Sequence, residues 1–434
     1  MILAAVPGAI VPTILGVPVD FILFGAILLG VAIFHHHTFR VALIGLSFVV
    51  AYKLIVTGFN TGPGFGGLVE HLKREWVILT NLFLLLLGFG LLSRHFEKSR
   101  IPAVLPRVLP HDWKGAFWLL VMVFVLSSFL DNIAAALIGG AMAHTLFRAK
   151  VHIGFLAAIV AASNGGGSGS VVGDTTTTMM WIDGVNPLDV LHGYAGAGIA
   201  LVVFGIPAAI QQQRYSPILK HEHQYVKVDL PRVGIVTFVL MMAIAANVIV
   251  NVQFPDFSDS FPFIGAAVAG ALLLTALVRR PDWEIIPEAI KGTVFLLSLV
   301  LCATLMPVER LPGASWQTAL GLGFVSAVFD NIPLTALALK QGGYDWGALA
   351  YAVGFGGSMI WFGSSAGVAL SNSYPEAKSV ALWLRHGWHV TVAYVVGFAA
   401  LMVIAGWHPH PPHKAGTTSA YLGIEEIHSA TSAL

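Results

Sequence analysis

Residues 126–137 read Leu-Ser-Ser-Phe-Leu-Asp-Asn-Ile-Ala-Ala-Ala-Leu, and residues 325–336 read Val-Ser-Ala-Val-Phe-Asp-Asn-Ile-Pro-Leu-Thr-Ala. Each copy places an acid beside an amide, Asp131-Asn132 or Asp330-Asn331, inside an apolar stretch. A Gly/Ser-rich interruption of another apolar stretch follows each copy, at 163–170 and at 363–367. The repetition predicts two related halves, each with an acid and a broken helix.

The composition is that of a membrane protein. Of 434 residues, 56% are hydrophobic and 10% are charged, whereas a soluble domain has about 25% charged residues. We therefore predict an all-α polytopic membrane protein whose first helices serve for membrane targeting. The formal net charge of +1 does not suggest a nucleic-acid partner. The single cysteine excludes an internal disulfide, no zinc-ligand spacing appears, and we expect neither an enzyme nor a cofactor.

Hydrophobic runs long enough to cross a bilayer core predict the transmembrane spans. These spans are 19–34, 41–57, 76–92, 152–181, 192–210, 233–251, 262–278, 292–306, 346–370 and 388–405. Two further apolar stretches, 114–147 and 314–340, carry Asp-Asn near their middle. Because a carboxylate at mid-membrane in a straight helix is costly, we interpret both stretches as re-entrant hairpins.

The distribution of lysine and arginine predicts the orientation. The basic loop 93–114 belongs in the cytoplasm by the positive-inside rule. If 114–147 enters and leaves on the same side, the basic loop 211–232 is cytoplasmic too, whereas a full crossing would move it outside. We therefore predict a bacterial-type inner (plasma) membrane protein with both termini outside. Lys53 lies near the outer interface, and we expect it to snorkel.

The predicted organisation is an inverted repeat, a common plan among transporters. Each half has three spans, a re-entrant hairpin and two spans, one of which is a broken helix. The predicted parts are an interfacial segment 1–18, a first repeat 19–210 with hairpin 114–147 and broken helix 152–181, a linker 211–232, a second repeat 233–405 with hairpin 314–340 and broken helix 346–370, and a polar His/Pro-containing tail 406–434.

Three acids fall at special places in this topology. Asp131 and Asp330 lie at the hairpin tips, and Asp174 follows the first glycine-rich break. An ionisable residue within the membrane indicates a functional site. The alternative is that each aspartate only caps a half-helix, although a neutral Asn or Ser could cap at lower cost in a bilayer.

The two breaks offer neutral oxygen ligands. Glycine frees backbone carbonyls, and carbonyls and hydroxyls suit hard cations. The alternative is close helix packing by small residues. We predict that the neutral ligands are Asn132, Asn164, Thr175, Thr176, Asn331, Ser364 and Ser365.

The electrostatics of this lining favour a small cation. No Lys or Arg lies in either hairpin core or break, and three carboxylates would repel an anion. A buried carboxylate holds either a proton or a metal ion, so that sodium binding releases protons and protonation releases sodium. We hypothesise that Na⁺ binds at Asp131, Asp174 and Asp330, and that the cation, the proton and the lipid bilayer are the partners.

The stretch Ser163-Asn-Gly-Gly-Gly-Ser-Gly-Ser-Val-Val-Gly-Asp-Thr-Thr-Thr-Thr-Met-Met-Trp181 resembles a motif of the NhaD-type sodium/proton antiporters. The stretches 330–335 and 363–369 resemble that family too, although Val171 stands where its motif has proline. The resemblance covers about residues 75–405. It implies the ion-transporter superfamily, which includes arsenite permeases and dicarboxylate/sodium symporters. It also implies an inverted repeat in a homodimer with scaffold and transport parts.

We therefore expect a secondary active transporter that exchanges Na⁺ or Li⁺ for H⁺ by alternating access. An arsenite or organic-anion (citrate-like) permease of the same superfamily is the second hypothesis. Asp-Asn at the tips differs from the Ser-Asn-Thr of the dicarboxylate branch, but the arsenite branch shares it. A third hypothesis is a non-transporting membrane subunit of a larger complex.

Overall fold

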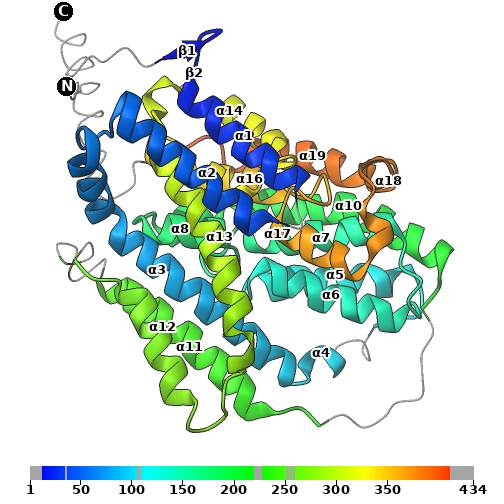
Figure 1. Ribbon diagram of the computed structural model, residues 1–434. Helices are drawn as coiled ribbons and strands as arrows, with labels where there is room; N and C mark the ends of the chain where they lie inside the picture. Colours follow the sequence, from blue (N-terminus) through cyan, green and yellow to red (C-terminus); the bar gives the residue numbers. More distant parts are fainter. Residues whose placement is uncertain are drawn as a thin grey trace, which may run out of the picture.

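A computed structural model describes residues 12–34, 37–104, 109–218, 227–250, 254, 257 and 260–410 (Figure 1). Almost every described element is a helix, apart from the short antiparallel pair β1 (Thr13–Ile14) and β2 (Val17–Pro18). The first half contains α1 (Val19–Ile33), α2 (Thr38–Tyr52), η1 (Lys53–Thr57), α3 (Gly64–Lys98), α4 (Ile101–Val104), α5 (Trp113–Ser127), α6 (Asn132–Leu146), α7 (Ile153–Gly167), α8 (Thr175–Ile182), α9 (Pro187–Leu191) and α10 (Gly193–Tyr215).

The second half has a similar order of long helices, but its short η turns lie at other places. It contains α11 (Leu230–Val248), α12 (Phe263–Thr275), η5 (Trp283–Ile285), α13 (Ile286–Thr304), η6 (Val308–Arg310), α14 (Trp316–Ser326), α15 (Asn331–Gln341), α16 (Trp346–Gly356), α17 (Ser365–Ser373), η7 (Pro375–Lys378), α18 (Val380–His386) and α19 (Trp388–Ile404).

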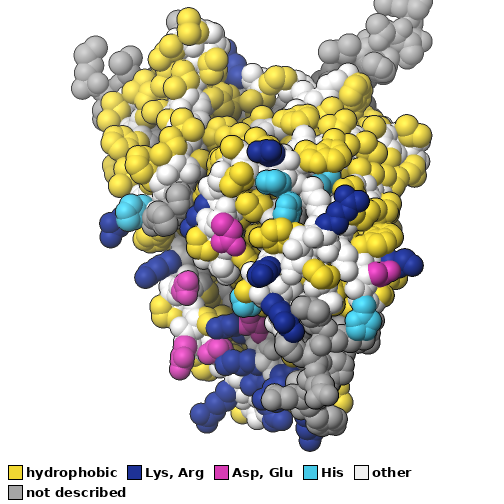
Figure 2. Space-filling view, turned by 90° about the vertical axis from the view of Figure 1, so that its right-hand side faces the viewer, with side chains coloured by type: hydrophobic (Ala, Val, Ile, Leu, Met, Phe, Trp, Pro, Cys, Tyr) yellow, Lys and Arg dark blue, Asp and Glu magenta, His cyan; other side chains and the backbone are white. Residues whose placement is uncertain are grey.

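The chain is an all-α polytopic membrane protein. Five described helical segments are long and apolar enough to cross a membrane, and a sixth is formed if the bent pair α18 and α19 counts as one span. The five are Thr38–Thr57, Gly64–Lys98, Pro187–Tyr215, Leu230–Val248 and Trp283–Thr304. The segments predicted at 19–34 and 262–278 form the shorter apolar helices α1 and α12. Figure 2 shows a largely apolar upper surface above a lower end where charged side chains gather.

Both predicted hairpins consist of two helices that meet at the Asp-Asn pair. Helix α5 ends at Ser127 and α6 begins at Asn132, while α14 ends at Ser326 and α15 begins at Asn331. Both predicted broken helices are interrupted as well, but at 168–174 and 357–364, so that residues 163–167 still belong to α7 and residues 365–367 already belong to α17. The opposite orientation of the halves, and the re-entry of the hairpins, stay predictions.

Matched hydrogen bonds fasten each hairpin to the broken helix of its own half. Ser127 Oγ donates to the Ser163 carbonyl at 2.5 Å, and Ser326 Oγ donates to the Val353 carbonyl at 2.7 Å. Both serines are fully buried, and each stands near the C-terminus of the first hairpin helix. This correspondence supports the two-repeat interpretation, because the same polar contact occurs in both halves.

The helices pack as two groups. Helices α1–α3 pack with α11–α13, and the hairpins and broken helices pack with α10 and α19. The groups meet mainly where α13 lies against α15 and where α3 lies against α6 and α8. The first broken helix thus reaches the boundary between the two groups through α8.

The predicted boundary segments fall partly outside the described residues. Within the segment 1–18, residues 12–18 hold the β1–β2 pair; residues 1–11 lie outside. The linker 211–232 begins inside α10, and α11 starts before it ends; residues 219–226 lie outside. Of the tail 406–434, residues 411–434 lie outside, and the His410 carbonyl accepts a hydrogen bond from Trp346 Nε1.

Lys53 does not snorkel as the sequence suggested. Its ammonium lies 2.7 Å from the Asp20 carboxylate, and the two side chains are 5% and 1% exposed. The reason is the π-helical turn η1, which begins at Lys53 and continues α2 beside α1. Lys53 is therefore the cationic group that neutralises this buried carboxylate.

We predict that Lys53→Met lowers the free energy of unfolding by about 3–5 kcal/mol, because it leaves a buried charge without a partner. Denaturant unfolding in detergent micelles measures the loss. The double variant Asp20→Leu/Lys53→Met is the control and should recover most of it. A single variant that unfolds like the wild type would contradict this role of the pair.

Candidate ion-binding site

The hairpin-tip aspartates cap the second helix of each hairpin. Asp131 and Asp330 have nearly the same backbone conformation, with φ/ψ of −51°/141° and −54°/140°. Asp131 Oδ2 accepts the Ile133 N–H at 3.1 Å, and Asp330 Oδ1 accepts the Ile332 N–H at 3.0 Å. Both tip aspartates therefore cap a helix, as the alternative interpretation expected, and each uses one carboxylate oxygen to do so.

The two breaks place different residues at equivalent positions. Asp174 precedes α8 in extended backbone (φ −144°, ψ 146°), and Ser364 precedes α17 in the same conformation (φ −141°, ψ 153°). Ser364 caps its own helix by accepting the Gly367 N–H at 3.2 Å, whereas the Asp174 side chain makes no such cap. The Asp174 carboxylate is therefore free to turn toward the hairpin tips.

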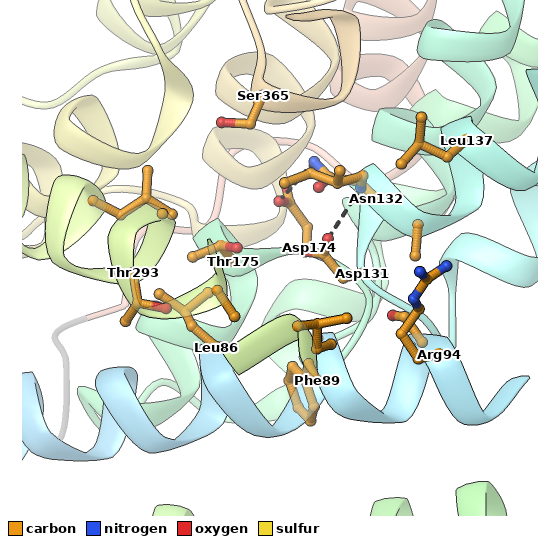
Figure 3. A pocket seen from close by; sticks show the side chains of 18 of the residues that line it. Leu86, Phe89, Arg94, Asp131, Asn132, Leu137, Asp174, Thr175, Thr293 and Ser365 are labelled. Atoms are coloured by element: carbon orange, nitrogen blue, oxygen red, sulfur yellow. Dashed lines mark hydrogen bonds between the residues drawn. The ribbon is translucent and has the colours of Figure 1, made fainter. Parts of the chain in front are cut away.

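Asp174 is the centre of the site. Asn132 Nδ2 donates to its Oδ1 at 3.0 Å, and Asn331 Nδ2 donates to its Oδ2 at 3.4 Å. Thr176 Oγ1 donates to the same Oδ2 at 2.6 Å. One carboxylate, 2% exposed, thus joins the amides of both hairpin tips. Figure 3 shows Asp174 beside Asn132 and Asp131.

Asn164 links the first break to the second. Its Oδ1 accepts from Asn132 Nδ2 at 3.0 Å, and its Nδ2 donates to Ser358 Oγ at 2.9 Å and to Ser364 Oγ at 3.0 Å. Asn164 and both serines are fully buried. Ser358 was not among the predicted site residues, although its position near the end of α16 within the second break was a signal for it.

The remaining hydroxyls divide between the tip aspartates and the backbone. Ser365 Oγ donates to Asp330 Oδ2 at 2.8 Å, and Thr175, at the equivalent position of the first half, lies beside Asp131. Thr177 and Thr178 turn away, since their hydroxyls donate to backbone carbonyls. All ten predicted site residues thus lie in one region, where the two breaks meet the two hairpin tips.

A cavity of about 360 Å³ reaches this region from the boundary between the helix groups. Helices α3 and α13 form one wall, and the hairpin tips form the other (Figure 3). Six of the predicted site residues line it: Asp131, Asn132, Asp174, Thr175, Asn331 and Ser365. The other four, Asn164, Thr176, Asp330 and Ser364, are not part of the lining.

Arg94 also lines the cavity, a position that the sequence alone did not indicate. It comes from α3, near the end that leads to α4, and its position depends on how α3 crosses α13. Its guanidinium pairs with Glu97 and lies 3.8 Å from Asp282. The cavity therefore contains a cationic group, but one already paired with carboxylates.

The chemistry of the site is that of hard oxygen ligands around one carboxylate. Among the described residues, no group of three His, Cys, Asp or Glu side chains could hold a metal ion together. Asp131 and Asp330 nevertheless lie within electrostatic reach of Asp174. A carboxylate with neutral amide and hydroxyl neighbours can accept either a proton or a small hard cation.

No family model matches the chain. It is 24% identical over 409 residues to a protein of Arabidopsis thaliana named "Sodium/proton antiporter 1". The alignment covers 84% of this chain and 69% of that protein. The chain is therefore similar to a sodium/proton antiporter over most of its length.

Gly173 shows why the break needs small residues. A Cβ at this position would stand 2.2 Å from the Ser127 carbonyl of the hairpin. We predict that Gly173→Ala destabilises the protein by about 1–3 kcal/mol, because the backbone must shift to relieve the overlap. Thermal unfolding in detergent measures this, with Gly198→Ala as the control.

Gly198 lies within α10, and a Cβ there would meet nothing within 4 Å. The control should unfold at or above the wild-type temperature, because alanine favours a helix over glycine. If the two variants are equally stable, the close contact between Gly173 and the Ser127 carbonyl does not limit the side chain at this position.

Proposed function

We propose that this protein is a secondary active transporter that exchanges Na⁺, or Li⁺, for H⁺ by alternating access. The proposal rests on the buried Asp174 carboxylate, which accepts hydrogen bonds from the side-chain amides of Asn132 and Asn331. A charge buried away from water is costly unless a proton or cation neutralises it. If the proton and the cation bind to the same carboxylate in turn, their movements across the membrane are coupled.

The neutral neighbours supply the ligands for a cation. In the arrangement described, Asn132 and Asn331 direct N–H groups at Asp174, which stabilises its negative charge. A half-turn of either amide would present its oxygen instead and complete a cation site with the Thr175 and Ser365 hydroxyls. Asp131 and Asp330 would add charge or carry protons at the edge of this site.

The cavity would give ions access to Asp174 from one side of the membrane. It runs from Asp174 to Arg94 and Glu288, toward the end of the molecule that carries α4 (Figure 1) and where charged side chains gather (Figure 2). By the positive-inside rule this end faces the cytoplasm. The proposed exchange would then take Na⁺ from the cytoplasm of a bacterial-type cell, with both termini outside and the transporter acting as a homodimer.

One observation favours the second hypothesis, that of an arsenite or organic-anion permease. Arg94 is a cationic group in a cavity large enough for a small organic anion. Its pairing with Glu97 and its proximity to Asp282 leave little positive charge, and Asp131 and Asp174 lie deeper in the same cavity. The balance of charge therefore favours a cation. The third hypothesis, a non-transporting subunit, leaves the matched polar contacts of both halves unexplained.

We predict that Asp174→Asn and Asp131→Asn each abolish sodium-driven pH changes in inverted membrane vesicles. Neither amide can alternate between a proton and a cation, so the coupling between the two flows is lost. The measurement is the fluorescence of a pH-sensitive dye upon addition of NaCl, LiCl or KCl.

Glu376→Gln is the control, because Glu376 is an exposed acid of η7 away from the cavity. It should exchange like the wild type. Full exchange by both aspartate variants would overturn the proposal. Uptake of arsenite or labelled citrate without sodium-linked proton flux would favour the second hypothesis instead.

A further inference from the structure

The mouth of the cavity is built from charged side chains on two helices. Ser93, Arg94 and Glu97 of α3 face Glu288 and Gly292 of α13. Glu288 is exposed, so the cavity reaches the surface here. Below the mouth the walls are apolar, with Leu86 and Phe89 labelled on α3 in Figure 3.

Most charges at the mouth are compensated. Arg94 pairs with Glu97, and Lys98 Nζ lies 2.8 Å from Asp282 Oδ2. The hydrogen bond from Lys98 holds the pKa of Asp282 below its usual range, so Asp282 stays charged and paired. These pairs join the end of α3 to the turn before α13.

Glu288 is the exception. Among the residues that the structure describes, it makes no ion pair, although it lies within electrostatic reach of Arg94. Among the charged side chains that line the entrance of this apolar-walled cavity, one cation, Arg94, thus faces two carboxylates, Glu97 and Glu288. Low-dielectric walls focus the field of such a charge and raise the local concentration of the opposite ion.

We propose that Glu288 attracts cations to the entrance of the cavity and so sets their apparent affinity, and that Arg94 limits this attraction by neutralising Glu97. The inference rests on the proposed cation exchange and adds the residue that sets its apparent affinity. Neither side chain takes part in the exchange at Asp174. Both act through the electrostatic potential that an entering ion meets.

A structural role is the alternative for Glu288. It lies in the first turn of α13, where an acid favours the helix dipole. Loss of that interaction would lower stability, but it would not change the half-saturating sodium concentration in a manner that depends on ionic strength. The two roles are therefore separable by transport measurements.

The test is sodium-dependent proton flux in inverted vesicles that contain the full chain, over a range of NaCl concentrations at low ionic strength. We expect Glu288→Gln to raise the half-saturating sodium concentration roughly threefold without changing the maximal rate. Added choline chloride should remove most of the difference by screening. Arg94→Gln should shift the half-saturating concentration in the opposite direction.

Glu284→Gln is the matched control, because Glu284 is an exposed acid of η5 that does not line the cavity. If the wild type exchanges ions and Glu288→Gln behaves like this control, the role of Glu288 is overturned while the proposed exchange stands. If the wild type gives no sodium-linked flux, the exchange proposal falls, and this inference falls with it.

Discussion

A carboxylate buried between two halves of a membrane protein must be stabilised by whatever surrounds it. Asp174 is 2% exposed, and amides from both hairpin tips and a hydroxyl from its own helix approach it. Because each donor sits at or near the start of a helix, the carboxylate positions several helix ends at once. The meeting of the two hairpins with the two breaks thus depends on this acid and on Asn164, which bridges to Ser358 and Ser364.

Close backbone approach makes this arrangement possible. The loop that ends at Gly173 lies directly against the hairpin turn, and Gly363 has the same relation to the second hairpin, where a Cβ would stand 2.5 Å from the Ala327 carbonyl. The close-packing and ligand interpretations of the glycine-rich stretches are therefore compatible. Small residues let the chain turn beside the tips, and the turn directs Asp174 or Ser364 toward the centre.

The sequence could predict that helices are interrupted at the two Asp-Asn pairs and near the two glycine-rich stretches, because each of these places residues in an apolar run that a lipid-facing helix does not tolerate. The structure adds that the halves are unequal, since Asp174 stands at the position that corresponds to Ser364. The sequence could not predict that Arg94 lines the cavity or that Lys53 is buried. Both depend on the packing of distant helices: α3 against α13 in one case, and η1 against α1 in the other.

The central claim is that a proton and a sodium ion compete for one carboxylate, Asp174. The direct measurement is calorimetric titration of the purified protein with NaCl at several pH values, in buffers of different ionisation enthalpy. If the two ions compete, the apparent sodium affinity falls as the pH is lowered, and sodium binding releases protons to the buffer. Sodium binding that is independent of pH and releases no proton would contradict this claim.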